Sequence, residues 1–319
     1  MKIAFLNMYN GLVDRGAETF VKEVAQKLAI RHEVVVFQSG GPSGKENYKV
    51  EKIPMKIDWA RKSGAGSFLS LLFLDYWNRL VFRFSLKTLS KIVKEKFDIV
   101  VPVNGGWMPA LMRLATWVYR GKMVISGQAG MGWDERNNLW CFPDTFVALS
   151  SKAKLWAKKV NPLIRTVYVP NGVDTERFTA NGPTFKTNLP KPIILCVGAL
   201  TKSKRIDLTI KAVANEMPQI YRAVDVFTLA SEPFHSFEIV LVEAMASSLP
   251  VVANKDDIRR EIVGRAGVLV DPTNTETYAI ALENAMRLRW GKRPQNQARK
   301  FSWDIIASQY QKLFRKITK

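Results

Sequence analysis

The stretch SEPFHSFEIVLVEAMASSLPVVA, Ser231 to Ala253, combines the elements that decide the fold of this chain. It reads as a polar loop, an amphipathic helix, a turn at Pro250 and a short apolar strand. A helix that leads into a buried strand is the repeating unit of α/β proteins. His235 stands eight positions before Glu243. The two residues are therefore either parts of a ligand site or neighbours of a core helix.

The same alternation of strands and helices runs along the whole chain. Strands are expected at KIAFL, EVVVFQ, DIVVPV, KMVIS, TFVALS and RTVYVP in the first half, and at PIILCVGAL, DVFTLA, PVVA and GVLVDP in the second. Such continuous apolar runs are typical of parallel strands covered on both faces. Between the halves, TANGPTFKTNLPKP is rich in turn residues. The pattern predicts an α/β fold of two Rossmann-like domains, residues 1–178 and 192–300, joined by a linker over 179–191 and facing each other across a cleft.

The composition is that of a globular protein with an unusually positive surface. The 319 residues include 48 Lys and Arg against 28 Asp and Glu, a net charge of +20. This charge favours anionic partners such as phosphorylated substrates or anionic lipid. No zinc-ligand cluster, RRM-like motif or long basic tail favours nucleic acid, so no nucleic-acid partner is expected. The opening MKIAFLNMYNG reads as a strand and a loop rather than a signal peptide, which predicts a cytoplasmic protein.

The apolar run SFLSLLFLDYWNRLVFRFSL, Ser67 to Leu86, has two possible interpretations. Charged residues interrupt it, so none of its uncharged apolar stretches is long enough to span a bilayer. Trp77, Phe82 and Phe84 alternate with Arg79 and Arg83, as in a helix that lies on an anionic membrane surface. The alternative is a helix buried against its own sheet.

Three further segments could carry chemistry at strand ends. NMYNGLVDRGAE contains Gly11 and Gly16 before a helix start, where free N–H groups can hold an anion, although an ordinary loop would look the same. VPNGVDTERF is a turn signal, and by itself only a hinge. VGALTKSKRIDLTIKAV places Lys204 among other basic residues after a strand, which suits a diphosphate or merely a solvated loop.

Together, these segments resemble the retaining GT-B glycosyltransferases, a family that includes the lipopolysaccharide glucosyltransferases and the phosphatidylinositol mannosyltransferases. The motifs that carry the resemblance are GLVDRGAE, PNGVDTERF, GALTKSK and HSFEIVLVEAMASSLPVVA. The closing KFSWDIIASQYQKLF is similar to the family's last helix, so residues 301–319 are expected to cross back to the first domain. The resemblance implies transfer of a sugar from a nucleotide-diphospho-sugar to a lipid-linked or polysaccharide acceptor, without a metal or other cofactor.

The resemblance also implies roles for single residues. Glu243 matches the glutamate that accepts hydrogen bonds from the donor ribose, and Lys204 matches the lysine that neutralises the donor diphosphate. The helix that starts near Phe237 offers its N-terminus to the same diphosphate. The donor site is thus expected to use Gly16, Gly198, Lys204, His235, Phe237 and Glu243, with Lys204, His235 and Glu243 as the catalytic group. Gly11 and Gln128 are expected on the acceptor side.

Several positions depart from the family pattern. His235 replaces the first glutamate of the E-x(7)-E pair, and Ala199 replaces an arginine that would bind phosphate. Glu238 stands where the family has glycine, at the expected second position of the helix, where a carboxylate would compete with the diphosphate for N–H groups. A strand–helix–strand segment is missing after Glu216, which predicts a shortened C-terminal domain. The alternative function is therefore a degenerate relative that binds a ligand or partner without catalysis.

Overall fold

A computed structural model describes residues 1–61, 67–196, 217–231 and 237–319 of the chain. The described residues form two compact units. The first comprises Met1–Val169 and Ala307–Lys319, and the second Pro170–Ile306. The expected site residues Gly198, Lys204 and His235 lie outside the described residues, as do Ala199 and the helix expected over IDLTIKAVANE.

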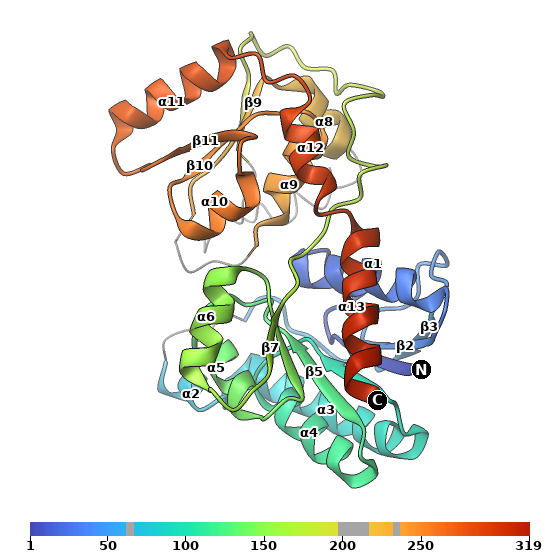
Figure 1. The fold of residues 1–319 in the computed structure, drawn as a ribbon. Helices are drawn as coiled ribbons and strands as arrows, with labels where there is room; N and C mark the ends of the chain where they lie inside the picture. The colour runs from blue at the N-terminus through green and yellow to red at the C-terminus, as the bar shows by residue number, and fades with distance from the viewer. Residues whose placement is uncertain (62–66, 197–216, 232–236) are drawn as a thin grey trace. The chain divides into compact units, whose positions relative to one another are not determined.

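The first unit is built on a parallel sheet of seven strands in the order β3-β2-β1-β4-β5-β6-β7 (Figure 1). The strands are β1 (Lys2–Leu6), β2 (Glu33–Gln38), β3 (Lys49–Lys52), β4 (Ile99–Pro102), β5 (Lys122–Ser126), β6 (Thr145–Ala148) and β7 (Thr166–Tyr168). Six of them were expected from apolar runs. The exception is β3, whose residues KVEK form an edge strand with no buried side chain, so no apolar run marked it.

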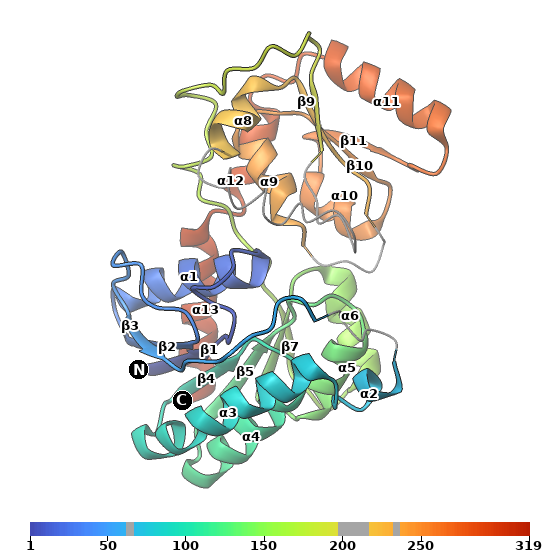
Figure 2. The ribbon, with the colours of Figure 1, turned by 180° about the vertical axis from the view of Figure 1, so that it is seen from behind.

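Helices connect these strands (Figures 1 and 2). They are α1 (Gly16–Ala29), α2 (Phe68–Leu71), α3 (Tyr76–Glu95), α4 (Trp107–Tyr119), α5 (Trp133–Trp140) and α6 (Ser151–Val160). The last helix, α13 (Trp303–Thr318), ends in the first unit. There Tyr310 packs against Phe20 of α1, with ring centroids 5.5 Å apart.

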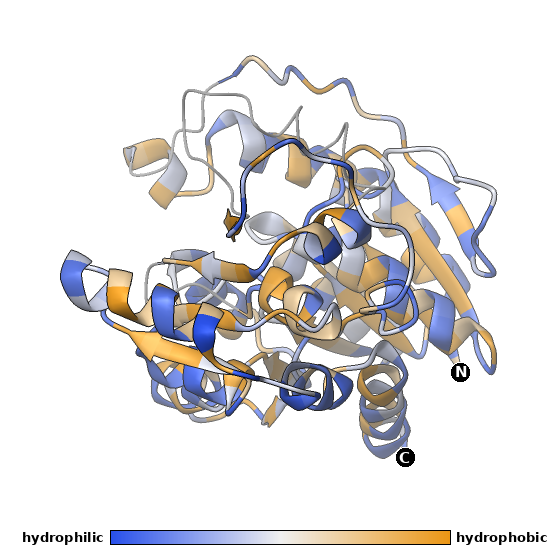
Figure 3. Ribbon diagram, turned by 90° about the horizontal axis from the view of Figure 1, so that it is seen from above, coloured by the Kyte–Doolittle hydropathy of each residue, from blue (hydrophilic) through white to orange (hydrophobic). Residues whose placement is uncertain are grey.

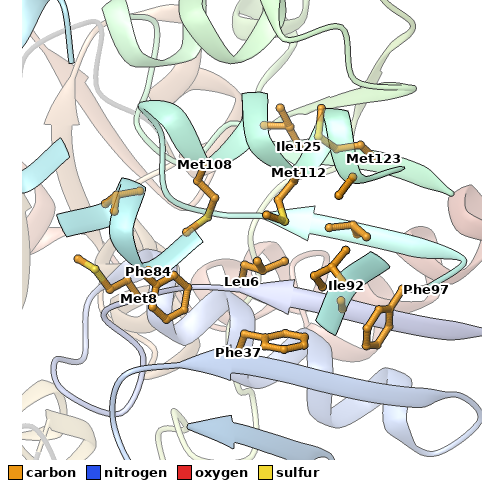
Figure 4. Close-up of a cluster of buried hydrophobic side chains, with 14 of the residues drawn as sticks. Leu6, Met8, Phe37, Phe84, Ile92, Phe97, Met108, Met112, Met123 and Ile125 are labelled. Carbon is orange, nitrogen blue, oxygen red and sulfur yellow. The ribbon is translucent and has the colours of Figure 1, made fainter. Parts of the chain in front are cut away.

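The core between the sheet and helices α3 and α4 is densely apolar (Figure 4). Leu6 and Phe37 from the strands meet Phe84 and Ile92 of α3 and Met112 of α4. The run expected over residues 67–86 is thus divided between α2 and the start of α3. Of its two interpretations, burial against the sheet is confirmed for α3, because Leu80, Val81 and Phe84 are all buried.

The second unit contains a smaller parallel sheet, in the order β11-β10-β9-β8 among the described residues. Its strands are β8 (Ile194–Cys196), β9 (Val226–Leu229), β10 (Val251–Asn254) and β11 (Gly267–Val270). Its helices are α8 (Met217–Ala223), α9 (Ile239–Ala246), α10 (Asp257–Val263), α11 (Thr275–Arg287) and α12 (Arg293–Arg299). The strands are mostly hydrophobic, whereas the helices other than α9 also carry hydrophilic residues (Figure 3). The predicted α/β class with a smaller second sheet is confirmed.

Candidate functional site

Glu243 lies on α9, a helix that is almost entirely apolar. Leu241, Val242, Ala244 and Met245 are buried around it, so the helix is anchored on several sides. Glu243 itself is half-buried. Burial raises the pKa of its carboxyl to about 7, against the opposing effects of a hydrogen bond from a tyrosine and the charge of Arg177. A carboxylate with so perturbed a pKa at a strand-end helix is a candidate for ligand binding.

The tyrosine is Tyr221, which sequence analysis missed. Its ring is fully buried, and its hydroxyl donates to Glu243 Oε2 at 3.1 Å. The burial of the phenol, together with the neighbouring Glu243, raises the pKa of Tyr221 well above its usual value. Tyr221 therefore remains a neutral donor and holds one oxygen of the carboxylate in place. Its sequence context, MPQIYRAV, contains no motif that would have singled it out.

The VPNGVDTERF turn meets the same cluster. The Phe178 ring packs edge-on against Tyr221, with ring centroids 5.9 Å apart. Gly172 is required here because a Cβ at this position would approach the Trp303 indole to 2.6 Å. Val173 N donates to Phe301 O at 2.7 Å, which fastens the turn to the closing FSW segment. Two motifs far apart in sequence, PNGVD-F and EAMA, thus converge on one carboxylate.

The residues before α9 differ from expectation. Phe237 is buried edge-on against Phe301, at a centroid distance of 5.3 Å, and so anchors the start of the helix. Glu238 is not the second residue of the helix but its N-cap, in the left-handed region with φ of +57°. Its side chain makes no capping hydrogen bond. We expected the Glu238 carboxylate to compete with a diphosphate for the helix N–H groups. The structure differs from this expectation, because the carboxylate lies 3.3 Å from Arg259 Nη2 and not on those N–H groups.

In the first unit, the loop after β1 is held by a polar network. Asn7 is fully buried, and its side chain donates to Glu18 Oε1 at 3.3 Å and accepts from Tyr9 N at 3.0 Å. Glu18 is buried in the first turn of α1 and pairs with Arg15 at 3.2 Å. The predicted residue Gly16 is the exposed first residue of α1. Asn104 after β4, missed in sequence analysis, accepts from Met8 N at 2.7 Å.

The predicted acceptor-side residues lie at different strand ends of the first unit. Gly11 has φ of +75° and packs against the turn that follows β2. Gln128 follows β5, and its Nε2 donates to Ser126 Oγ at 2.8 Å. The Ser126 hydroxyl is also hydrogen-bonded to Tyr310 of α13, at 2.8 Å. Both predicted residues therefore border the carboxyl edge of the sheet, where ligands of such folds bind.

Glu135 of α5 was not predicted from the sequence. Its carboxyl is buried and accepts hydrogen bonds from Ala129 N and Asn138 Nδ2, both at 2.9 Å. Burial raises its pKa to about 7, and the two hydrogen bonds offset only part of that effect. The surrounding SGQAGMGWDE loop was noted only for Gln128, because an acidic residue in a helix's first turn is ordinary in sequence.

An aromatic cluster borders the β1 loop. The rings of Tyr9, Trp59 and Trp77 lie with centroids 6.0 to 6.4 Å apart in each pair. Arg15 lies over the Tyr9 ring at 4.9 Å. The Trp59 side chain is 52% exposed, so part of the cluster faces solvent. Exposed aromatic faces of this kind can stack against the C–H groups of a sugar ring.

A second surface, here called the apolar face, covers α2 and the outer side of α4. Its exposed residues are Phe68, Leu69, Leu71, Leu72 and Leu74 around α2, and Trp107, Leu114, Trp117 and Val118 on α4. The α4 residues repeat at helical spacing and form one stripe. Two indoles hold the segment around α2 in place. Trp107 Nε1 of α4 donates to Phe73 O, and Trp133 Nε1 of α5 donates to Leu71 O, each at 3.0 Å.

Basic residues flank the apolar face. Arg79 and Arg83 are exposed on α3, and Phe82 between them packs edge-on against Trp107. In the part of the chain that the structure describes, neither arginine forms an ion pair. Within the same residues, no helix is both long and apolar enough to cross a bilayer. The face therefore combines apolar and cationic groups at the protein surface.

Two family models match the chain. The model described as Glycosyltransferase Family 4 matches residues 15–177, about half of the chain. The model described as Glycosyl transferases group 1 matches residues 212–287. The second match contains Tyr221, Glu238 and Glu243, and the first ends at Arg177 in the PNGVD-F turn.

Curated relatives match over part of their length. D-inositol 3-phosphate glycosyltransferase of Corynebacterium glutamicum is 31% identical over 140 residues, 42% of this chain and 33% of that protein. Phosphatidyl-myo-inositol mannosyltransferase of Mycobacterium tuberculosis is 35% identical over 104 residues, 29% of this chain and 28% of that protein. The matched region thus spans about a third or less of these relatives.

Solved structures match over nearly the full chain. HepE of Anabaena, in complex with UDP-glucose, has a TM-score of 0.69 at 18% identity, covering 99% of this chain and 100% of that one. WaaG, a glycosyltransferase involved in lipopolysaccharide biosynthesis, has a TM-score of 0.65 at 14% identity, covering 98% and 99%. At such low identity the likeness concerns the fold, and the expected GT-B architecture is confirmed.

Proposed function

The chain belongs to Glycosyltransferase Family 4, and on that premise we propose that it moves a sugar from a nucleotide-diphospho-sugar to a lipid-linked or polysaccharide acceptor with retention at the anomeric carbon. The observation that carries this proposal is the convergence of the PNGVD-F and EAMA motifs on Glu243. Tyr221 orients one oxygen of that carboxylate at 3.1 Å. The other oxygen is then available to a ligand.

Glu243 acts as the ribose clamp of the donor. An ionised carboxylate accepts hydrogen bonds from two neighbouring hydroxyls, and such charge-assisted bonds are short and strong. Arg177 favours the ionised form, whereas burial opposes it. A half-buried carboxylate held by one tyrosine gains most when polar hydroxyls replace its lost hydration. This arrangement therefore suits a vicinal diol, which is what the ribose of a nucleotide provides.

The diphosphate of the donor binds at the start of α9, with Lys204 as its counter-charge. Helix N-terminal N–H groups attract anions, and the Glu238 side chain does not occupy them. Negative charge develops on the leaving diphosphate as the anomeric carbon–oxygen bond breaks, and preorganised donors stabilise that charge. Gly198, Phe237 and His235 complete the proposed donor side in the second unit. Gly16, the first residue of α1, stays a donor residue predicted from the family resemblance.

The acceptor binds to the first unit, beside the loop after β1. Trp59, with Tyr9 and Trp77 behind it, offers an aromatic face to an acceptor sugar. Gly11 allows the loop its left-handed turn, and Gln128 offers an amide at the neighbouring strand ends. A saccharide-bearing acceptor, lipid-linked or polymeric, matches a site with both stacking and hydrogen-bonding groups.

Donor binding separates this proposal from the alternative of a degenerate, non-catalytic relative. We expect UDP-glucose or GDP-mannose, added at about 100 times its dissociation constant, to stabilise the protein by about 3 kcal/mol, seen as a rise in Tm. Release of free nucleoside diphosphate on addition of lipid-linked saccharide would then establish transfer. Stabilisation without any turnover would favour the alternative, and no stabilisation by either nucleotide-sugar, with no response to the free nucleoside diphosphates, would reject the proposal.

We also propose that the apolar face binds the surface of an anionic membrane on its cytoplasmic side. Tryptophans and leucines enter the interfacial region of a bilayer, and neighbouring arginines pair with anionic headgroups. Both groups occur together here, on α2, α4 and the exposed side of α3. This surface would bring the enzyme to a lipid-linked acceptor. The sequence interpretation assigned membrane contact to the run over 67–86, which contains α2 and the first half of α3. It did not predict the exposed apolar stripe on α4.

Vesicle flotation tests the membrane proposal. Replacement of Arg79 and Arg83 with glutamine should weaken binding to phosphatidylglycerol vesicles at low salt by about 2 kcal/mol, or roughly thirtyfold, since each basic residue near the surface contributes about 1 kcal/mol. Trp117→Ser should also weaken it, whereas Ile280→Ser, an equally exposed apolar residue of the second unit, should not. A wild-type protein that does not float with anionic vesicles at low salt would contradict the proposal.

A further inference from the structure

A fully buried arginine lies at the ligand-binding edge of the second sheet. Arg259 of α10 is 0% exposed. Its Nη2 donates to Ser231 Oγ and lies 3.3 Å from Glu238 Oε1, and its Nη1 lies 3.6 Å from Asp256 Oδ2. Nε and Nη1 have no hydrogen-bond partner among the described residues. Buried donors without partners are costly, so a native protein that keeps them calls for an explanation.

Glu238 carries a second cost at the same place. Its φ of +57° is a left-handed backbone conformation that residues other than glycine rarely adopt. Glycine would adopt such a φ without strain. Glu238 gains no capping hydrogen bond in return. Backbone strain of this kind persists only where the surroundings impose it, and it concentrates at ligand sites.

Both residues stand where the strands end. Ser231 follows β9, and its N–H donates to Asn254 at the end of β10 at 2.8 Å. Glu238 precedes the first turn of α9, and Arg259 reaches it from α10. The guanidinium thus connects a strand end to a helix start at the carboxyl edge of a parallel sheet. Ligands of doubly wound folds bind at this edge.

We propose that Glu238, held by Arg259, accepts a hydroxyl group of the donor's sugar and so determines which sugar is transferred. The inference rests on the proposed transferase function and names the recognition residue within it. Arg259 fixes Oε1, and Oε2 has no partner among the described residues. An ionised carboxylate offers only acceptors, which match a hydroxyl donor. Arg259 is a positioning residue in this arrangement, because it acts through Glu238.

A neutral sugar fits this site better than the diphosphate does. Two carboxylates, Glu238 and Asp256, lie within 3.6 Å of the guanidinium and compensate its charge. A phosphate at the same place would be repelled by both. The two Arg259 donors without a hydrogen-bond partner among the described residues, Nε and Nη1, are buried rather than open to solvent. The pair therefore presents an acceptor of fixed position to a hydroxyl, rather than a positive charge to an anion.

The test compares affinities for a nucleotide-sugar and for its nucleoside diphosphate by calorimetry, using UDP-glucose with UDP and GDP-mannose with GDP. Glu238→Gly should weaken binding of the sugar nucleotide by about tenfold or more, the loss typical of one hydrogen bond to a charged group. It should leave the affinity for the nucleoside diphosphate within about twofold. Glu238→Gln, which retains the side-chain shape, should show the same direction of change, and it covers the case that the glycine variant folds poorly.

Ser248→Gly is the matched control. Ser248 also has a left-handed φ, +70°, and lies just beyond the other end of α9. Glycine there relaxes the backbone in the same way but removes no sugar acceptor, so the ratio of the two affinities should not change. A nucleotide-sugar whose sugar lacks the accepted hydroxyl should bind wild type about tenfold more weakly than the parent nucleotide-sugar does. The Glu238→Gly variant should bind the deoxy analogue and the parent nucleotide-sugar equally well.

Failure of this inference and failure of the proposed function give different results. If wild type binds both sugar nucleotide and nucleoside diphosphate, but Glu238→Gly and Glu238→Gln leave the affinity ratio unchanged, the sugar role is overturned and the transferase proposal stands. If the variants instead bind the nucleoside diphosphate more tightly with the ratio unchanged, Glu238 merely repels the diphosphate, which also overturns the inference. Wild type that binds neither ligand overturns both proposals.

Discussion

Replacement of Glu243 with glutamine is expected to weaken nucleotide-sugar binding by about 10²-fold. The reason is the loss of two charge-assisted hydrogen bonds from the ribose, each contributing about 1.5–3 kcal/mol, partly retained by the amide oxygen. The fold should survive, because glutamine matches the shape of glutamate and its carbonyl can still accept from Tyr221. Calorimetric titration with the nucleotide-sugar measures the affinity, and a urea transition measures stability separately.

The pH dependence gives this prediction a distinct signature. Since the pKa of Glu243 is raised to about 7, the ionised acceptor predominates only above that pH. Affinity for a nucleotide-sugar should therefore rise between pH 6 and pH 8 in wild type and stay flat in Glu243→Gln. A nucleotide-sugar is the right probe, since its diphosphate is esterified at both ends and does not titrate in this range.

Stability should follow the opposite trend with pH. The folded-state pKa of Glu243 lies above the usual value of 4.5, so the folded state binds the proton more tightly than the unfolded state does. Its contribution to the free energy of unfolding is present below about pH 4.5 and is lost as pH rises through about 7. Glu243→Gln should flatten that part of the profile. The binding measurement decides the ribose role separately. If Glu243→Gln and wild type bound the nucleotide-sugar with equal affinity, Glu243 would not bind the ribose.

Tyr221→Phe is the companion variant. It leaves the carboxylate in place but removes the donor at 3.1 Å that orients it. We expect a smaller loss of donor affinity, about fivefold to tenfold, from a net hydrogen-bond contribution of about 1 kcal/mol. Phe178 and Phe227 still pack against the ring, so stability should change little. A loss as large as that of Glu243→Gln would indicate that Tyr221 itself contacts the donor.

Gly40→Ala is expected to destabilise the protein by about 3 kcal/mol, the upper range for overpacking in a closely packed site. A Cβ on Gly40 would lie 2.3 Å from the carbonyl carbon and oxygen of Gly11. These are backbone atoms, so no side-chain rotation can relieve the contact. Gly40 N also donates to Asn10 O at 3.1 Å, which fixes the two loops together.

The neighbouring Gly41 provides the control. A Cβ there meets nothing within 4 Å, and the residue is exposed. Gly41→Ala should therefore leave the midpoint of a urea transition unchanged or slightly higher, because alanine lowers the entropy of the unfolded chain. If the two alanine variants were equally stable, the close approach of Gly11 and Gly40 would not be a constraint on the loop. That loop borders the proposed acceptor site, so Gly40→Ala should also impair transfer.

Much of the fold could be predicted from local sequence. Strands such as EVVVFQ and KMVIS are continuous apolar runs, and each was placed to within a residue or two. The family was correctly inferred from motifs, because PNGVD-F and EAMA encode tight turns and a buried helix that tolerate few alternatives. β3 could not be predicted in this way. β3 is held by its pairing with β2, and its mostly charged residues, none of them fully buried, form no apolar run that would predict a strand.

Some residues of the candidate site could likewise be predicted from local sequence, and others could not. Glu243 and Gly11 were identifiable from motif position, and the exposed stripe on α4 was not, because which face of a helix meets the sheet depends on its neighbours. The sequence also misplaced Glu238 by assigning it to the helix. Its left-handed backbone and its contact with Arg259 bring together residues 21 positions apart, and no local pattern encodes that distance.

By itself, then, the sequence of this protein determined the α/β class, the smaller second sheet and the glycosyltransferase family, and it singled out Glu243 as a candidate site residue. Those properties follow from hydrophobic periodicity and short turn motifs, which act over a few residues. Only the tertiary structure decided that Tyr221 orients Glu243, that Arg259 is buried beside a strained Glu238, and that Gly11 packs on Gly40. Burial, pKa and charge pairing depend on what surrounds a side chain, and those surroundings come from distant parts of the chain.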